Sequence, residues 1–279
     1  MVTASEAFAR VVIALEPYAA QVVFVGGWVH ALFLAEAGAT EGAVITDDID
    51  VTLPPLLLTE GRPRLVELAS SAGFEIDPMS ALDGASMRLT IPGPGDSLID
   101  LDLLTEAEQP GVAVVIDGQG GLRAQGYPWQ AIALENSRWI SVGTDIHETL
   151  DPPRKIRVPT IGAYILHKGL SSITRTRLNK EAKDLVYLHE ILRHPSLGQL
   201  AVEGLPDLAA RYPSAYAGWW GRVAGVSRNS RLLREIADQL LVGGRAQGDP
   251  GNVVAAVTAR LRRTLAEAPT PGGEADAPG

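Results

Sequence analysis

The pattern of hydrophobic and polar positions predicts strands in the first half of the chain and helices in the second. The apolar run Val22–Val25 is typical of a short buried strand, and apolar residues recur at helical spacing over Trp28–Ala35. Alternating or short apolar runs predict further strands at Ile45–Leu53, Phe74–Ile76, Ala85–Ile91, Ser97–Thr105 and Ser137–Val142. Helical spacing predicts helices at Ala4–Tyr18, Gly61–Gly73, Thr160–Ile173, Leu185–Leu192 and within Pro206–Ala266. The sequence therefore predicts an α+β fold, a sheet with flanking helices followed by a helical C-terminal domain.

Prolines and glycines indicate where domains meet. The rigid break Asp151–Pro153 predicts a boundary between a first domain, 1–153, and a helical domain, 154–266. Pro159 is expected in the first turn of the helix that follows, where a missing amide costs nothing. The residues 267–279 are rich in Pro and Gly and lack large apolar side chains, which predicts a disordered tail.

The first candidate for chemistry is the stretch from Val22 to Leu53. Gly26 and Gly27 separate the strand from the helix, and such a turn leaves backbone amides at a helix N-terminus, where a phosphate can bind. Asp48 and Asp50 lie two residues apart in the next predicted strand, so their side chains share one face. Two carboxylates this close repel each other unless a cation lies between them, and oxygen ligands of this kind suit Mg²⁺ or Mn²⁺. The alternative is a solvated strand face after an ordinary turn.

A second Asp-x-Asp strand, Ser97–Thr105, contains Asp100 and Asp102 on the face opposite Leu101 and Leu103. Strands disfavour Asp, which makes two of them in one strand unusual. One of the two would complete a carboxylate cluster that holds two metal ions, and Asp102 is preferred over Asp100. The alternative is the polar face of an edge strand.

Charge divides the chain in the same way as the secondary structure. Residues 1–150 contain 6 Lys and Arg against 21 Asp and Glu, whereas residues 151–279 contain 18 against 12. An acidic half suits metal or a cationic substrate and a basic half suits phosphates. The alternative is that both halves present ordinary solvated surfaces. Lys168 lies in an otherwise apolar helical stripe, which predicts that it contacts an anion.

Composition excludes several other classes of protein. There is no cysteine, so disulfides, thiolate metal sites and cysteine nucleophiles are excluded. The first residues predict an amphipathic helix and not a signal peptide, and no apolar run approaches the about 18 residues needed to span a membrane. We therefore expect a cytoplasmic protein with no membrane partner. Arginines follow a group of aromatic residues, Tyr212, Tyr216, Trp219 and Trp220. We predict that these aromatic side chains belong to a helical core, and the alternative is that they stack on RNA bases.

The Gly26–Gly27 turn followed by the Asp48-x-Asp50 strand resembles the polymerase-β-like nucleotidyltransferase superfamily, although the gap between the two motifs is longer than usual. The segment Ala163–Leu192 resembles the helical half of the AbiEii-like branch, with a lysine in an apolar helix (Lys168), an arginine-bearing linker, and a Lys-Asp pair that opens the next helix (Lys183 and Asp184). Many members have a further acid where this chain has Tyr187.

This resemblance implies a nucleotidyltransferase-type mixed sheet and a Mg²⁺-dependent (or Mn²⁺-dependent) enzyme. Asp48, Asp50 and Asp102 or Asp100 would hold the metal. The nucleoside triphosphate, ATP among the candidates, would bind Gly26, Gly27, Lys168, Lys183 and Arg177, and Asp184 would orient Lys168 or an acceptor group. The product would be a nucleoside monophosphate joined to a hydroxyl.

The resemblance leaves the acceptor open. The AbiEii-like branch implies a toxin of a bacterial toxin–antitoxin pair, with a tRNA end or a protein as acceptor and a cognate antitoxin as partner. The Gly26-Gly27-Trp28 start also resembles lincosamide and aminoglycoside nucleotidyltransferases, and an acidic first half suits a cationic drug. A catalytically inactive nucleotide-binding relative is a third alternative. A metal nuclease would use the same acids but would not need the Gly-Gly turn.

Overall fold

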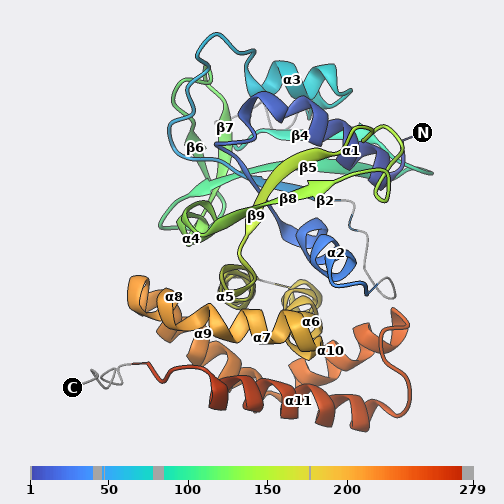
Figure 1. Ribbon diagram of the computed structural model, residues 1–279, viewed down its shortest axis with the longest axis vertical. Helices are drawn as coiled ribbons and strands as arrows, with labels where there is room; N and C mark the ends of the chain where they lie inside the picture. Colours follow the sequence, from blue (N-terminus) through green and yellow to red (C-terminus); the bar gives the residue numbers. More distant parts are fainter. Residues whose placement is uncertain (1, 40–45, 47, 78–84, 176, 272–279) are drawn as a thin grey trace. The chain divides into compact units, whose positions relative to one another are not determined.

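The computed structural model describes residues 2–39, 46, 48–77, 85–175 and 177–271. It contains two compact units, Met1–Ala31 with Ile45–Pro159, and Leu32–Val44 with Thr160–Gly279. The first unit contains a mixed β-sheet with flanking helices, and the second is helical in its described part (Figure 1). The predicted α+β fold class is confirmed.

The sheet of the first unit is built around its longest strand, β5 (Leu98–Glu106). The first half of β5 lies between β2 (Asp48–Thr52), to which it is parallel, and β4 (Arg88–Pro92), to which it is antiparallel. The antiparallel edge strands β1 (Val23–Val25) and β3 (Glu75–Ile76) extend the sheet beyond β2 and β4. The second half of β5 pairs in parallel with β7 (Arg123–Tyr127), and β7 forms an antiparallel hairpin with β6 (Val112–Val115).

Helices of the first unit cover the sheet through apolar stripes. Thr3 caps α1 (Ala4–Ala14) by accepting a hydrogen bond from the amide of Glu6, and α1 and α3 (Leu65–Ser71) lie side by side (Figure 1). Phe8 is fully buried and stacks on Trp28 with ring centroids 4.3 Å apart. A 3₁₀ turn, η1 (Glu16–Tyr18), follows α1. Glu106 accepts hydrogen bonds from the amides of Trp129 and Ala131, at the N-terminus of α4 (Gln130–Glu135). These bonds satisfy amide donors that have no partner within the helix.

A two-stranded antiparallel ribbon, β8 (Ser137–Val142) and β9 (Arg154–Pro159), completes the first unit. The sequence predicted β8 but assigned the residues of β9 to the start of the helical domain, 154–266. The prediction for Pro159 is wrong, because it is the last residue of β9 and not part of a helix. The N-cap of the following helix is Thr160, which accepts a hydrogen bond from the amide of Ala163.

The second unit packs helices around α5 (Ile161–Ser171), whose residues are buried on all sides up to Leu170. Trp219 is fully buried and donates a hydrogen bond to the carbonyl of Ile165, and Phe33 meets Tyr164 edge to face at 5.4 Å. Trp219 is therefore core. The remaining elements are η2 (Ser172–Thr174), α6 (Leu178–Arg193), α7 (Pro195–Glu203), α8 (Leu205–Arg211), α9 (Pro213–Val226), α10 (Ser230–Val242) and α11 (Pro250–Glu267).

Several boundaries differ from the predicted ones. The helix α2 (Gly26–Glu36) begins at Gly26, so the two glycines are its first residues and not a separate turn. The helix α6 begins at Leu178, so Asp184 does not open it but lies in its middle. The strand β2 begins at Asp48; Ile45 and Asp47 lie outside the described residues, as does most of the predicted tail, from residue 272. Among the described residues, no helix combines the length and the apolar character that crossing a membrane requires.

Candidate functional site

The four aspartates predicted as candidate ligands lie on neighbouring strands of the first unit. In the parallel pairing of β2 with β5, Asp48 is the partner of Asp100 and Asp50 is the partner of Asp102. Partners in register point to the same face of a sheet, so the four carboxylates share one face. The intervening residues Ile49 and Leu101 are buried on the opposite face.

Asp50 lies against the start of α2. The residue Gly26 has φ +77°, and a Cβ built on it would lie 1.8 Å from Oδ2 of Asp50. Both the left-handed backbone and the lack of space therefore require glycine at this position. The antiparallel pairing of Val25 with Asp50 brings the carboxylate to this point, and Gly27 follows, buried, in the first turn of α2.

The environments of Asp100 and Asp102 differ. Arg88 on β4 forms an ion pair and a hydrogen bond with Oδ2 of Asp100, and this interaction raises the pKa of the Arg88 guanidinium. The other oxygen of Asp100, Oδ1, is buried without a hydrogen-bond partner among the described residues. Burial raises the pKa of Asp102 to about 7, and the charges of Asp50, Asp48 and Asp100 act in the same direction. The face thus concentrates negative charge that Arg88 balances only in part.

These residues fit a hard divalent cation in their chemistry. The donors are all carboxylate oxygens, which suit Mg²⁺ and Mn²⁺, and such a cation would offset the negative charge that helps to raise the pKa of Asp102. In the described part of the chain, however, no group of three or more side chains already converges as a metal site. Asp48, Asp50 and Asp102 would have to rotate toward a common ion.

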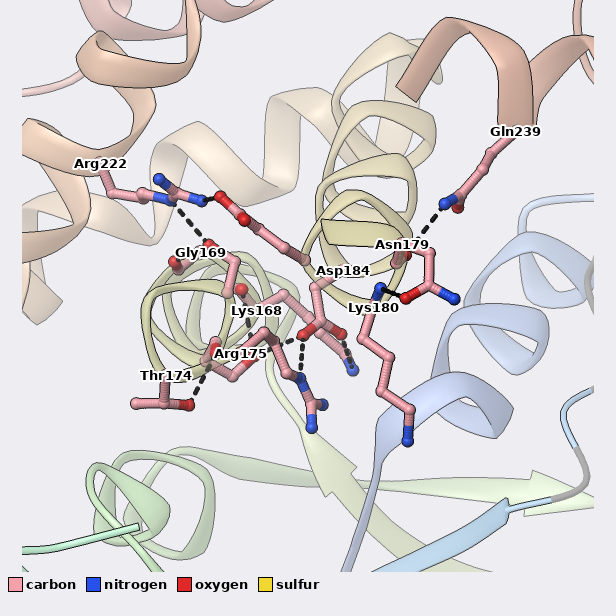
Figure 2. A network of polar contacts seen from close by, with 12 residues as sticks. Lys168, Gly169, Thr174, Arg175, Asn179, Lys180, Asp184, Arg222 and Gln239 are labelled. Carbon is pink, nitrogen blue, oxygen red and sulfur yellow. Dashed lines mark hydrogen bonds and ion pairs between the residues drawn. The ribbon is translucent and has the colours of Figure 1, made fainter. Parts of the chain in front are cut away.

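The predicted lysine and aspartate of the second unit form a buried ion pair. Nζ of Lys168 on α5 lies 3.0 Å from Oδ1 of Asp184 on α6, and both side chains are almost fully buried. Nε of Arg175 lies 2.9 Å from the other oxygen, Oδ2, and Ser171 also donates to it at 3.3 Å (Figure 2). One carboxylate therefore serves two cations.

This arrangement decides the protonation of the buried groups. Burial alone would raise the pKa of Asp184, but the charges and hydrogen bonds of Lys168 and Arg175 lower it, so the carboxylate is ionised. The pKa of the neighbouring His167 falls to about 4 because of burial, with a smaller contribution from Lys168. His167 is therefore neutral at pH 7.

The other predicted phosphate-binding residues are less enclosed. Lys183 lies beside the ring of Tyr187, with Nζ 5.9 Å from the ring centroid, and Arg177 is an exposed residue at the N-cap of α6. Two arginines that the sequence did not single out hold the site aspartates, Arg88 in the first unit and Arg175 in the second. The sequence did contain a signal for Arg88. A basic residue in a strand that can pair with the Asp100–Asp102 strand is a candidate counter-ion for those aspartates.

Comparisons with known proteins add a distant structural likeness. No protein-family model matches the sequence, and no curated protein matches it. The chain is similar to a solved structure, an antigenic nucleotidyltransferase-like protein from Paracoccidioides brasiliensis, with 12% sequence identity and a TM-score of 0.37. The superposition covers 78% of this chain and 94% of that one.

Proposed function

We propose that this protein is a nucleotidyltransferase that uses Mg²⁺ or Mn²⁺ to transfer a nucleoside monophosphate from a nucleoside triphosphate to a hydroxyl, with release of pyrophosphate. The observation that carries the proposal is the register of β2 with β5, which places four aspartates on one face with Asp50 against the start of α2. A cation site beside a helix N-terminus is an arrangement that suits a metal-bound triphosphate.

Each residue has a role that follows from its surroundings. Asp48 and Asp50 would bind the cation that accompanies the triphosphate, and Asp102 would bind a second near the acceptor hydroxyl. We assign the third carboxylate to Asp102, because Arg88 already neutralises Asp100. When bound, the cations would offset negative charge that develops on the phosphates. Gly26 and Gly27 would present the first amides of α2 to a phosphate.

For the second unit we propose phosphate binding through its cations. Lys168 and Arg175 share the single carboxylate of Asp184, which leaves one positive charge in excess for an anion. Lys183 and Arg177 would add to it from α6. The AbiEii-like resemblance of this segment supports an RNA end, such as that of tRNA, or a protein as the acceptor. It also supports a toxin-like role with a cognate antitoxin.

The test is incubation with each α-labelled nucleoside triphosphate, total tRNA and cell lysate, with Mg²⁺ or Mn²⁺, beside an Asp50→Asn variant. We expect label on RNA or protein that depends on the cation and is lost in the variant. The matched control is Asp117→Asn, which neutralises an aspartate after β6 that is not among these four residues. Label that persists in Asp50→Asn would contradict the site. Absence of label with every nucleotide in the wild type would contradict the activity toward these acceptors, and aminoglycoside and lincosamide drugs would be tested next.

A further inference from the structure

The second unit contains a cavity of about 300 Å³ that the predicted site residues do not explain. Its wall is formed by Ser172 and Ile173 of η2, by Arg175, by Glu181 of α6 and by Arg222 of α9. Gly221 and Gly225 of α9 complete the lining of this open pocket, and we refer to these two residues as its floor. The pocket is therefore lined by two arginines, an apolar side chain and bare helix backbone.

The polar wall is organised and carries excess positive charge. Nε of Arg222 donates to Oγ of Ser172 at 3.0 Å, and the same guanidinium forms an ion pair with Glu181 (Figure 2). Arg175, on the other side, is held by Asp184, which Lys168 already neutralises. These five charged residues comprise three cations and two carboxylates. An anion in the cavity would meet a guanidinium whose position is already fixed, which lowers the entropic cost of binding.

The glycines of the floor have no explanation inside the chain. A Cβ on Gly169 would collide with Trp219, and one on Gly218 would contact Leu170, so packing accounts for small residues there. For Gly221 and Gly225, in contrast, no atom in the described part of the chain lies within 4 Å of a Cβ built on them. Glycine weakens a helix relative to alanine. Two glycines on one face of α9 with open space around them therefore lower the stability of the helix, and no packing contact among the described residues explains them.

The space that these glycines leave is suited to a planar group. Four residues along a helix span about 6 Å, and without side chains this stretch of backbone is flat enough to contact one face of a ring. Ile173, whose side chain is 48% exposed, lies at the edge of the same cavity and offers an apolar contact. A ligand that fills the cavity would thus have a flat apolar part and an anionic part.

We propose that this cavity binds a nucleotide, with its base on the Gly221–Gly225 floor beside Ile173 and its phosphates at Arg175. The choice of a nucleotide over other planar anions rests on the function proposed above. Guanidinium groups bind phosphate through paired hydrogen bonds, and a base that contacts only backbone and an aliphatic side chain is not read by hydrogen bonds, so modest selectivity among the four nucleotides follows.

The experiment fills the floor without disturbing the fold. Gly221→Leu and Gly225→Leu place a side chain into open space on exposed helix positions, and leucine favours a helix more than glycine does. The matched control is Ala217→Leu, an exposed residue of the same helix that does not line the cavity. Circular dichroism melting verifies that each variant is folded. Calorimetric titration of ATP, GTP, CTP and UTP is performed without divalent cations, so that the acidic face of the first unit does not contribute.

We expect both floor variants to bind nucleotide at least about tenfold more weakly than the wild type, and Ala217→Leu to bind as the wild type does. Inorganic tripolyphosphate is the second probe, and its affinity should be equal in all four proteins because it has no base. Wild-type nucleotide affinity in both floor variants would overturn the proposal. So would equal losses for tripolyphosphate and nucleotide, or a wild type that binds no nucleotide.

The outcome is separable from that of the proposed function. Asp50→Asn should lose transfer and keep nucleotide binding to the cavity. If Asp50→Asn abolishes transfer while the floor variants bind normally, the transferase stands and the cavity proposal is wrong. If the floor variants lose binding and no protein shows transfer, the cavity proposal stands and the transferase is wrong.

Discussion

At the scale of single residues, the contact between Gly26 and Asp50 is the most constrained feature of the acidic face. Glycine is required there twice, for its positive φ and for the space that the carboxylate occupies. Backbone strain and steric exclusion are usually hard to separate, but the chain provides a comparison. Gly38 has nearly the same φ, +75°, and no atom of the described residues lies within 4 Å of a Cβ built on it.

We predict that Gly26→Ala lowers the free energy of unfolding by more than Gly38→Ala does. Gly38→Ala meets only the backbone strain, about 1–2 kcal/mol, whereas Gly26→Ala must also displace Asp50. Urea denaturation of the two variants measures the difference. Gly26→Ala should in addition lose transferase activity, and Gly38→Ala should keep it. If both variants lowered the free energy of unfolding equally, the Asp50 side chain would move aside without any loss of stability, which would contradict the prediction.

Asp102 provides a second residue-scale prediction, for protein free of divalent cations. Its folded pKa of about 7 lies above the ordinary value of 3.8, so the folded state disfavours the ionised form. Stability associated with Asp102 is therefore present at low pH and lost as pH rises to about 7. Asp102→Asn should raise the free energy of unfolding at pH 8 by up to about 4 kcal/mol, and by less at pH 5. Urea denaturation in a chelating buffer measures the stability change at pH 8 and at pH 5. If Asp102→Asn were less stable than the wild type at pH 8, the ionised Asp102 would not be unfavourable in the folded protein and the prediction would be wrong.

At the scale of elements, α5 and α6 are joined by a polar contact inside an apolar interface. Lys168 and Asp184 come from the buried faces of the two helices, and Arg175 lies in the connection between them. Removing one member of a buried ion pair leaves the other charge without compensation, which costs more than the pair contributes. The three residues are not equivalent, because Asp184 pairs with both cations.

We predict that Asp184→Asn destabilises the protein more than Lys168→Met does. The first variant leaves two cations without a carboxylate and should cost about 3–5 kcal/mol, whereas the second leaves Asp184 paired with Arg175. Denaturant unfolding of the two variants and of the double variant decides this. The double variant should be more stable than Asp184→Asn alone. An additive result would mean that the pair is not coupled.

The helix α9 permits an element-scale prediction of opposite sign. Gly221→Ala and Gly225→Ala each add one methyl group to an exposed helix position with open space around it. Each should raise the free energy of unfolding by about 0.5–1 kcal/mol, the usual advantage of alanine over glycine in a helix. Thermal or urea unfolding measures the gain, with Gly169→Ala as the control that must lose stability because Trp219 fills its space. A loss of stability at either floor position would show that something within the chain occupies the cavity.

At the scale of the whole molecule, the two units should respond to acid in opposite directions. In the second unit, burial lowers the pKa values of His167 and His189 to about 4 from 6.5. A lowered histidine pKa means that stability is complete above pH 6.5 and is lost as pH falls toward 4. In the first unit, the raised pKa of Asp102 has the reverse effect, since protonation of Asp102 relieves repulsion.

We predict that acidification from pH 7 to pH 5 without divalent cations reduces hydrogen-exchange protection in α5 and α6 and not in β2 and β5. The loss in the second unit should reach about 2 kcal/mol for each histidine. Exchange measured by mass spectrometry, corrected for the intrinsic pH effect on exchange rates, tests this. In the His189→Leu variant, the hydrogen-exchange protection of α6 should fall less on acidification than it does in the wild type. Uniform loss across both units would contradict the assignment.

Much of the local structure could be predicted because it depends on short-range patterns. The strand period of two was enough to place Asp48 and Asp50 on one face and Asp100 and Asp102 on one face. Runs of apolar residues located β1, β5, β8 and α5 to within a few residues. The strands β7 and β9 and the helices α4 and α7 were missed, because each is too short to show a clear apolar period and packing against neighbours selects its conformation.

The sequence by itself determined the chemistry of the chain, which consists of two Asp-x-Asp strands, a Gly-Gly helix start and a lysine in an apolar helix. Only the tertiary structure decided the pairing of these groups. The register of β2 against β5, the contact of Gly26 with Asp50 and the choice of Arg88 and Arg175 as partners depend on residues far apart in the chain. Local pattern specifies which face a side chain occupies, whereas its neighbour across a sheet or helix interface is set by how the elements pack.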